Sequence, residues 1–166
     1  MAGWWGEVSA TLVSEFSDIA DPSELTIICT RLLMAALLGG LLGYEREQSG
    51  KAAGIRTHML VCMGAALFVL TPLRAAGGSD DAIGRVIQGI AAGIGFIGAG
   101  TILKGEGNQA QVKGLTTAAG LWLTAAIGVA VGMGREATAL LSTFIALLIL
   151  SVVPLLAISV FNKKKD

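Results

Sequence analysis

The residues that could recognise a ligand or a partner gather first around one short connection between two apolar stretches. Its charged and polar members are Glu45, Arg46, Glu47, Arg56, Thr57 and His58. A carboxylate at a helix C-terminus and a cation at the next N-terminus each oppose the helix dipole, at about 0.3–1 kcal/mol. Both penalties cancel if Glu45 or Glu47 pairs with Arg56, so we expect this ion pair, with Thr57 as the N-cap of the second helix. The pair is either a clasp between two helix ends or part of a polar cluster that recognises a partner or an ion.

Other polar residues extend this set of binding candidates. His58 is the one histidine of the chain, so we expect a hydrogen-bonded residue between helices rather than a metal ligand. Thr116 and Thr117 stand at the start of a later apolar stretch, directly after Lys113. Either threonine caps a helix there, or free N–H groups beside Lys113 bind an anion or a partner carboxylate. Arg85, at the start of another apolar stretch, is a further candidate.

The distribution of carboxylates argues against a metal-transport site and against catalysis. None of the twelve acidic residues falls within 48–79, 82–105, 107–135 or 137–165. Cation transporters usually place an acid within the membrane, and divalent cations need several oxygen ligands. A carbonyl-lined or hydrated pore stays open, so Mg²⁺ is possible without an assigned ligand. No Cys–His or Ser–His–Asp grouping is evident, and we expect a non-enzymatic protein without a cofactor.

Composition identifies the class of protein. Of the 166 residues, 54% are hydrophobic and 23 are glycine, while 14% are charged, against about 25% in soluble domains. The formal net charge is zero, which gives no basic surface for nucleic acid. The glycine motif at 93–98 matches G-x-G-x-x-G, but it lies inside an apolar stretch and not after a strand. These features predict a small all-α integral membrane protein.

The apolar stretches predict five transmembrane helices, at about 24–44, 56–74, 83–103, 114–133 and 136–161. Eight basic residues then fall on one side of the membrane and three on the other. By the positive-inside rule the N-terminus is outside and the C-terminus is cytoplasmic. A bend is expected at Pro154. Arg31 lies inside the first span, where it either extends to the surface or faces the bundle interior.

The chain before the first span predicts a separate interfacial segment. Apolar residues recur there at helical spacing behind two tryptophans, a pattern typical of an amphipathic helix on the membrane surface. Its members are Trp4, Trp5, Val8, Leu12, Phe16 and Ile19. Asp21 and Pro22 follow as N-cap and first residue of the next helix. We therefore divide the chain into an interfacial segment (1–23), a five-helix domain (24–162) and a basic tail (163–166).

Glycines at spacings of three to five predict how the helices pack. In lipid, close backbone approach replaces apolar burial as the force that holds helices together. The glycines expected at helix contacts are Gly39, Gly43, Gly89, Gly93, Gly95, Gly98, Gly128 and Gly132. Their number also favours a self-association face, and we expect a homodimer or another homo-oligomer.

Three motifs resemble a known family. They are Gly43-Tyr44-Glu45-Arg46-Glu47 followed by Ala53-Gly54-Ile55-Arg56-Thr57-His58, the glycine-rich run 93–102, and 112–119 with Trp122. Together they are similar to the N-terminal membrane domain of the MgtC/SapB family, over about residues 30–133. The resemblance implies a bacterial inner-membrane protein with a periplasmic N-terminus, linked to growth at low magnesium, acid stress and virulence. It also implies action by binding other membrane proteins, including the ATP synthase.

Two differences from other members indicate which branch of that family the chain resembles. Many members continue into a cytoplasmic ACT-type domain, whereas this sequence ends at Asp166. The virulence members carry Asn where Thr116 stands and Cys where Leu123 stands, so this chain resembles the SapB or YhiD branch more. Our first hypothesis is a protein that modulates membrane partners through its polar cytoplasmic cluster. The alternative is a transporter or channel for Mg²⁺ or another small solute along the glycine-rich helices.

Overall fold

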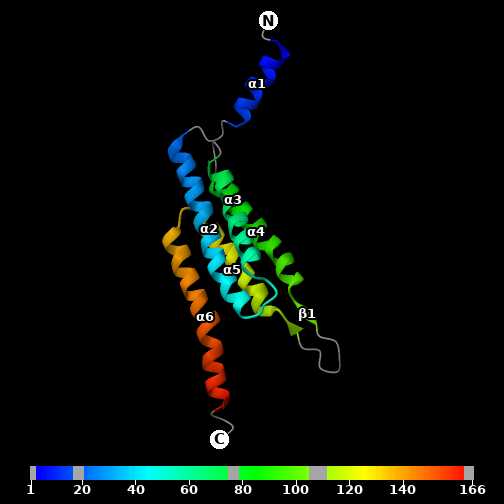
Figure 1. Cartoon of the computed structure of the whole chain (residues 1–166), viewed down its shortest axis with the longest axis vertical. Coiled ribbons are helices and arrows are strands. Elements are labelled where there is room, and N and C mark those ends of the chain that lie inside the picture. Colours follow the sequence, from blue (N-terminus) through cyan, green and yellow to red (C-terminus); the bar gives the residue numbers. More distant parts are fainter. Residues whose placement is uncertain (1–2, 17–20, 75–78, 105–111, 163–166) are drawn as a thin grey trace. The chain divides into compact units, whose positions relative to one another are not determined.

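The computed structural model describes residues 3–16, 21–74, 79–104 and 112–162 (Figure 1). In chain order its elements are α1 (Trp4–Glu15), α2 (Pro22–Gln48), α3 (Ile55–Arg74), α4 (Asp80–Gly100), β1 (Leu103–Lys104), β2 (Val112–Lys113), α5 (Leu115–Gly132) and α6 (Glu136–Asn162). The two short strands pair antiparallel, with Leu103 opposite Lys113. The described chain is therefore almost entirely helical, as the composition predicts.

Five of these helices are long and apolar enough to cross a membrane, namely α2 to α6. The predicted fold class, a bundle of five transmembrane helices, is confirmed. The boundaries differ by three or four residues at three places, one of which is the start of α4, at Asp80 and not at 83. Helix α2 continues four residues beyond the predicted end at 44, to Gln48. Helix α4 ends at Gly100, and the residues predicted to extend it to 103 instead lead into β1. Helix α6 continues through Pro154 as one helix.

The chain divides into two compact units, Met1–Thr30 and Arg31–Asp166. In the first unit, α1 has no buried residue, and the Trp4 and Trp5 rings meet edge to face with centroids 4.5 Å apart. The expected helix position of Ile19 lies outside the described residues. Asp21 caps α2 as expected, because its carboxylate accepts the Ser23 amide at 3.0 Å. The Ser23 amide and hydroxyl together hold the pKa of the Asp21 carboxyl below its usual value.

In the second unit, α3 and α5 form the most extensive helix pair, and α4 packs on both. One apolar core joins α2, α3, α5 and α6 through small and branched side chains: Ala35, Leu38, Leu42, Cys62, Ala66, Ile127, Val131, Ala139 and Ala146. A second core joins α3, α4 and α5 around Ala65, Ile94, Leu121 and Ala125. Helix α5 contributes to both cores, so it is the central element of this unit.

Glycines bring α2 and α5 against α3 at backbone distance. A methyl group added to Gly39 of α2 would lie 2.5 Å from the His58 carbonyl oxygen. One added to Gly132 of α5 would lie 2.6 Å from the Ala66 carbonyl oxygen, and one on Gly128 would overlap the Cys62 carbonyl. Real Cβ atoms essentially never approach other atoms below 3.0 Å, so only glycine fits these positions. Helix α3 is thus held between two glycine-bearing neighbours.

Arg31 takes the second of the two orientations that its sequence position left open. Its Nη1 donates to the Gly132 carbonyl oxygen at 2.8 Å, and its Nε lies 3.8 Å from Glu136 Oε1. A cation at the C-terminus of α5 and an anion at the N-terminus of α6 both match the helix dipoles. Arg31 therefore ties α2 to the α5–α6 turn, where Gly134 has the left-handed φ of 73°.

Candidate functional site

Charged residues meet where α2 ends, but not in the expected pairing. The Arg46 side chain is 4% exposed and donates two hydrogen bonds to the carboxylate of the neighbouring Glu45. Arg46 Nη2 donates to Glu45 Oε1 at 2.7 Å, and Arg46 Nε donates to the other carboxylate oxygen. The Ser49 hydroxyl donates to the same Oε1 at 2.9 Å. Glu45 is therefore engaged by residues of its own helix and its immediate continuation.

The expected ion pair with Arg56 is wrong for both carboxylates. Glu47 Oε2 accepts the backbone N–H of Ile55, the first residue of α3, at 2.9 Å. No ion pair between Arg56 and either glutamate occurs among the described residues, and Arg56 is exposed. The dipole penalty is relieved in another way, because α2 is one turn longer than predicted. The extra turn brings the Glu47 carboxylate to the N-terminus of α3, where a negative charge is favourable.

The predicted threonine caps are also wrong. Helix α3 begins at Ile55, so Thr57 lies inside its first turn and is exposed. Helix α5 begins at Leu115 after Gly114, which has a φ of 96° and provides no side-chain cap. A Cβ on Gly114 would overlap the Thr101 carbonyl oxygen, so this sharp turn requires glycine. Thr116 and Thr117 therefore both lie in the first turn of α5.

His58 is fully buried between the helices. Its Nδ1 lies 3.0 Å from the Gly54 carbonyl oxygen, which only accepts, so Nδ1 carries the proton. The other ring nitrogen, Nε2, is buried without a hydrogen-bond partner. A methyl group added to Gly120 of α5 would lie 3.8 Å from Nε2. The unpaired ring nitrogen therefore faces α5 at a position that has no side chain. An unsatisfied polar atom at such a depth costs free energy and identifies a position of functional interest.

The glycines predicted to pack helices divide into two groups. Gly43, like Gly39, Gly128 and Gly132, meets α3 closely, since an added methyl would lie 2.6 Å from Ile55 Cα. A methyl group added to Gly98 of α4 would lie 3.4 Å from Ala118 Cβ, an ordinary contact distance. By contrast, an added methyl on Gly89, Gly93 or Gly95 would meet nothing within 4 Å. The prediction that these three α4 glycines pack helices is therefore wrong within the described chain.

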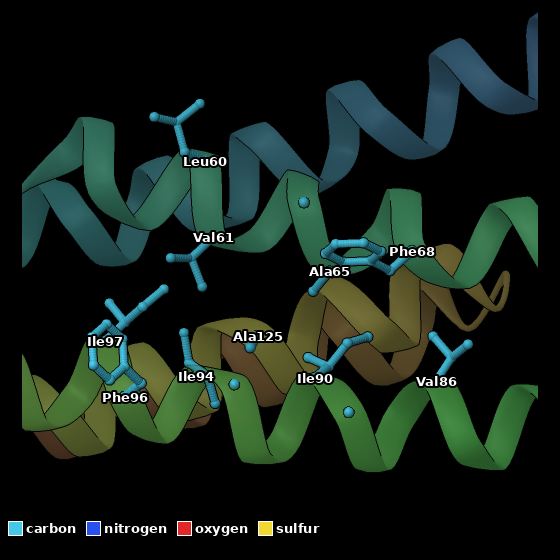
Figure 2. A pocket seen from close by; sticks show the side chains of 13 residues that line it. Leu60, Val61, Ala65, Phe68, Val86, Ile90, Ile94, Phe96, Ile97 and Ala125 are labelled. Atoms are coloured by element: carbon cyan, nitrogen blue, oxygen red, sulfur yellow. The ribbon is translucent and has the colours of Figure 1, made fainter.

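Gly89 and Gly93 of α4 border an apolar groove between α3 and α4, shown in Figure 2. Its volume is about 730 Å³. Val61, Ala65 and Phe68 of α3 face Ile90, Ile94 and Ile97 of α4 across it, with Ala125 of α5 behind (Figure 2). None of the thirteen lining residues carries a polar side chain.

A second groove, of about 570 Å³, brings Arg46 together with the start of α5. Thr116, Thr117 and Gly114 line it from α5, and Ser49 and Lys51 line it from the chain after α2. Ser49 and Lys51 were missed by the sequence analysis, because their role depends on where α2 ends. Lys113 is exposed in β2 next to this groove, whereas Arg85 is exposed near the start of α4, away from it.

The described residues contain no group of three or more His, Cys, Asp or Glu side chains that could hold a metal ion.

Of the residues predicted for the site, the structure brings together Glu45, Arg46, Thr116 and Thr117, with Glu47 and His58 at the adjoining start of α3. It does not bring Arg85 to this place. The arrangement suits recognition of charged or hydrogen-bonding groups.

Comparison with known proteins identifies the family. The sequence model of the MgtC family matches residues 32–158. Protein SrpB of Synechococcus elongatus is 46% identical over 130 residues, which cover 73% of this chain and 71% of SrpB. The putative magnesium transporter YhiD of Escherichia coli is 40% identical over 141 residues, 80% of this chain and 63% of YhiD.

Protein MgtC of Salmonella typhimurium is 47% identical over 116 residues, 70% of this chain and 48% of MgtC. This chain thus spans about half the length of that relative. No solved structure matches the chain. The matched region contains α3, α4 and α5 with all the polar residues of the candidate site, and the chain belongs to the MgtC family.

Proposed function

We propose that this chain is a non-enzymatic protein of the bacterial inner membrane that serves magnesium homeostasis by binding and modulating another membrane protein. The name of YhiD, putative magnesium transporter, and the name of MgtC support the link to magnesium. The basic end of the bundle, where α2 ends and α3 and α5 begin, faces the cytoplasm in this proposal. The N-terminus is then periplasmic.

One observation carries the proposed mode of action. The carboxylates of Glu45 and Glu47 are engaged within the chain, by Arg46 and by the Ile55 amide. Arg56 and Lys113 are exposed at the same end and form no ion pair with a described residue. Two exposed cations that form no ion pair within the described part of the chain fit a surface for acidic groups of a partner.

Crosslinking in cells tests this proposal. A photoreactive amino acid replaces Arg56 or Lys113, and the same replacement at Arg85, which is exposed near the start of α4, is the control. We expect one membrane protein to be captured from positions 56 and 113 and not from 85. Capture should weaken about fivefold in a chain that carries Arg56→Ala with the probe at 113. Equal capture from all three positions contradicts the proposal.

The alternative function, transport of Mg²⁺ along the glycine-rich helices, is separated by a flux assay. The groove beside the α4 glycines is lined by apolar groups alone, which is a poor path for a hydrated divalent cation. We expect proteoliposomes with this chain to show no Mg²⁺ flux above empty vesicles. Flux that disappears in Gly95→Leu overturns the binding proposal in favour of transport. The expected homodimer stays a prediction, which native mass spectrometry of the detergent-solubilised chain tests.

A further inference from the structure

The groove between the end of α2, the start of α5 and α6 has one polar half and one apolar half. The polar half comprises Arg46, Ser49, Lys51, Thr116 and Thr117. The apolar half comprises Val112, Leu115, Ile149, Leu150, Val153 and Pro154. Four of the apolar residues belong to α6, within its candidate membrane span Glu136–Pro154. The groove therefore connects apolar residues at the end of the α6 membrane span with polar residues at the end of α2 and the start of α5.

The start of α5 supplies backbone donors to this groove. The first helical hydrogen bond of α5 runs from the Ala118 amide to the Gly114 carbonyl oxygen, at 2.9 Å. The amides of Leu115, Thr116 and Thr117 precede it, so they have no carbonyl partner within the helix. All three residues line the groove. Such N–H groups at a helix start favour an anion, and phosphate is the usual one.

The Thr117 side chain gives an independent indication of a ligand. Thr117 is 3% exposed, lines the groove, and its hydroxyl forms no hydrogen bond with a described residue. The other two buried threonines are satisfied, since Thr124 donates to the Gly120 carbonyl and Thr143 to the Ala139 carbonyl, both at 2.8 Å. The Thr117 hydroxyl oxygen is not one of the fully buried unpartnered atoms of the described residues, so the small exposed part of this side chain includes its oxygen, at the groove. Thr117 therefore has a donor left for a group that enters the groove.

Two cations complete the polar half. Arg46 gives two of its five N–H donors to Glu45, so three remain, although its side chain is 4% exposed. Lys51 is exposed at the rim and lines the same groove. With Glu45 balancing Arg46, the side chains around the groove leave one net positive charge, to which the dipole of α5 adds. The polar half thus suits a single negative charge with several oxygen acceptors.

We propose that this groove binds the phosphate of an anionic phospholipid, with one acyl chain against the apolar wall of α6. The phosphate diester accepts from Lys51, from the Thr117 hydroxyl and from the free amides of α5. An acyl chain would contact the apolar α6 side of the groove. A soluble phosphate would make no use of that apolar wall. This site goes beyond the proposed function, because it needs no protein partner.

Native mass spectrometry of the full-length chain in detergent tests this site, with dioleoyl phosphatidylglycerol as the probe. Dioleoyl phosphatidylcholine, which has the same chains without net charge, is the lipid control. We expect phosphatidylglycerol to bind about fivefold more tightly than phosphatidylcholine. Lys51→Gln should weaken its binding about fivefold, and Thr117→Val, which keeps the shape, about tenfold. The matched variants Arg85→Gln and Thr124→Val lie outside the groove and should bind as the wild type.

Two results would overturn the proposal. Equal affinity of the wild type, Lys51→Gln and Thr117→Val for phosphatidylglycerol would show that the groove does not hold the headgroup. Displacement of the lipid by millimolar inorganic phosphate, or binding of phosphate alone that is lost in Thr117→Val, would assign the site to a soluble anion. Because Lys51 is exposed and Thr117→Val is isosteric, both variants should fold, which unchanged circular dichroism would verify.

Discussion

Replacing Gly39 by alanine tests whether backbone contact between α2 and α3 holds the bundle. The new methyl would lie 2.5 Å from the His58 carbonyl oxygen and 2.8 Å from Cys62 Cβ. An ordinary contact begins at 3.4 Å, so the two helices must separate by about 0.9 Å. A gap of that size forfeits about a quarter to a half of each dispersion contact along the interface.

The expected magnitude follows from two opposing effects. Overpacking of this kind costs about 1–3 kcal/mol, and a rigid backbone carbonyl cannot turn aside as a side chain can. Alanine recovers up to about 1 kcal/mol through its helix propensity. The net loss is about 1–2 kcal/mol, which lowers the melting temperature by about 2–8 °C.

The matched control is Gly93→Ala, the same change in a helix where the added methyl meets nothing within 4 Å. This variant should melt at the wild-type temperature or slightly above it, because propensity alone acts. The assay is thermal unfolding of the detergent-solubilised protein, followed by circular dichroism. A Gly39→Ala protein as stable as the wild type, or two variants that lose equal stability, would refute the reasoning.

Three further predictions concern single polar side chains. Glu47→Ala removes the acceptor of the Ile55 amide and should cost about 1 kcal/mol, seen as faster hydrogen exchange at the start of α3; unchanged exchange contradicts this role. Arg31→Met leaves the Gly132 carbonyl without its charged donor and should cost about 1.5–3 kcal/mol in thermal unfolding, whereas an unchanged melting temperature would show that water replaces it. The Asp21 carboxyl has a lowered pKa in the folded chain, so its cap stabilises α2 above the unfolded pKa and is lost as pH falls through the folded pKa. Since the Ser23 amide is the larger cause of this shift and stays in Ser23→Ala, an NMR titration should find the pKa raised only in part in that variant, and an unaltered titration would exclude the Ser23 hydroxyl as a contributor.

The sequence predicted the helices well, because each span is a long and mainly apolar run, long enough to cross a membrane. It could not predict which side chains meet at the helix ends. The Glu47 contact depends on one extra turn of α2, because the helical path of residues 45–48 sets the direction in which the Glu47 side chain points. Both threonine caps are wrong because the helices begin before the threonines, α3 at Ile55 and α5 at Leu115, directly after Gly114 with its left-handed φ.

Glycine spacing showed the same limit. It predicted that some helix faces approach closely, and Gly39 and Gly132 do so. The same spacing in α4 gave Gly89 and Gly93, which lie beside an open groove. Spacing defines a face of a helix, whereas the neighbour of that face depends on how all five helices are arranged. Thr117 shows the converse, because its unused hydroxyl becomes visible only once the groove is formed.

The position of α3 has a mechanical consequence. Its backbone carbonyl groups lie against glycines of two neighbouring helices, Gly39 of α2 and Gly128 and Gly132 of α5. A displacement of α3 along its own axis would drive those oxygens into the next side chains of both neighbours. Movement of its first turn, where His58 and the Glu47 contact lie, must therefore carry α2 and α5 with it as one rigid block.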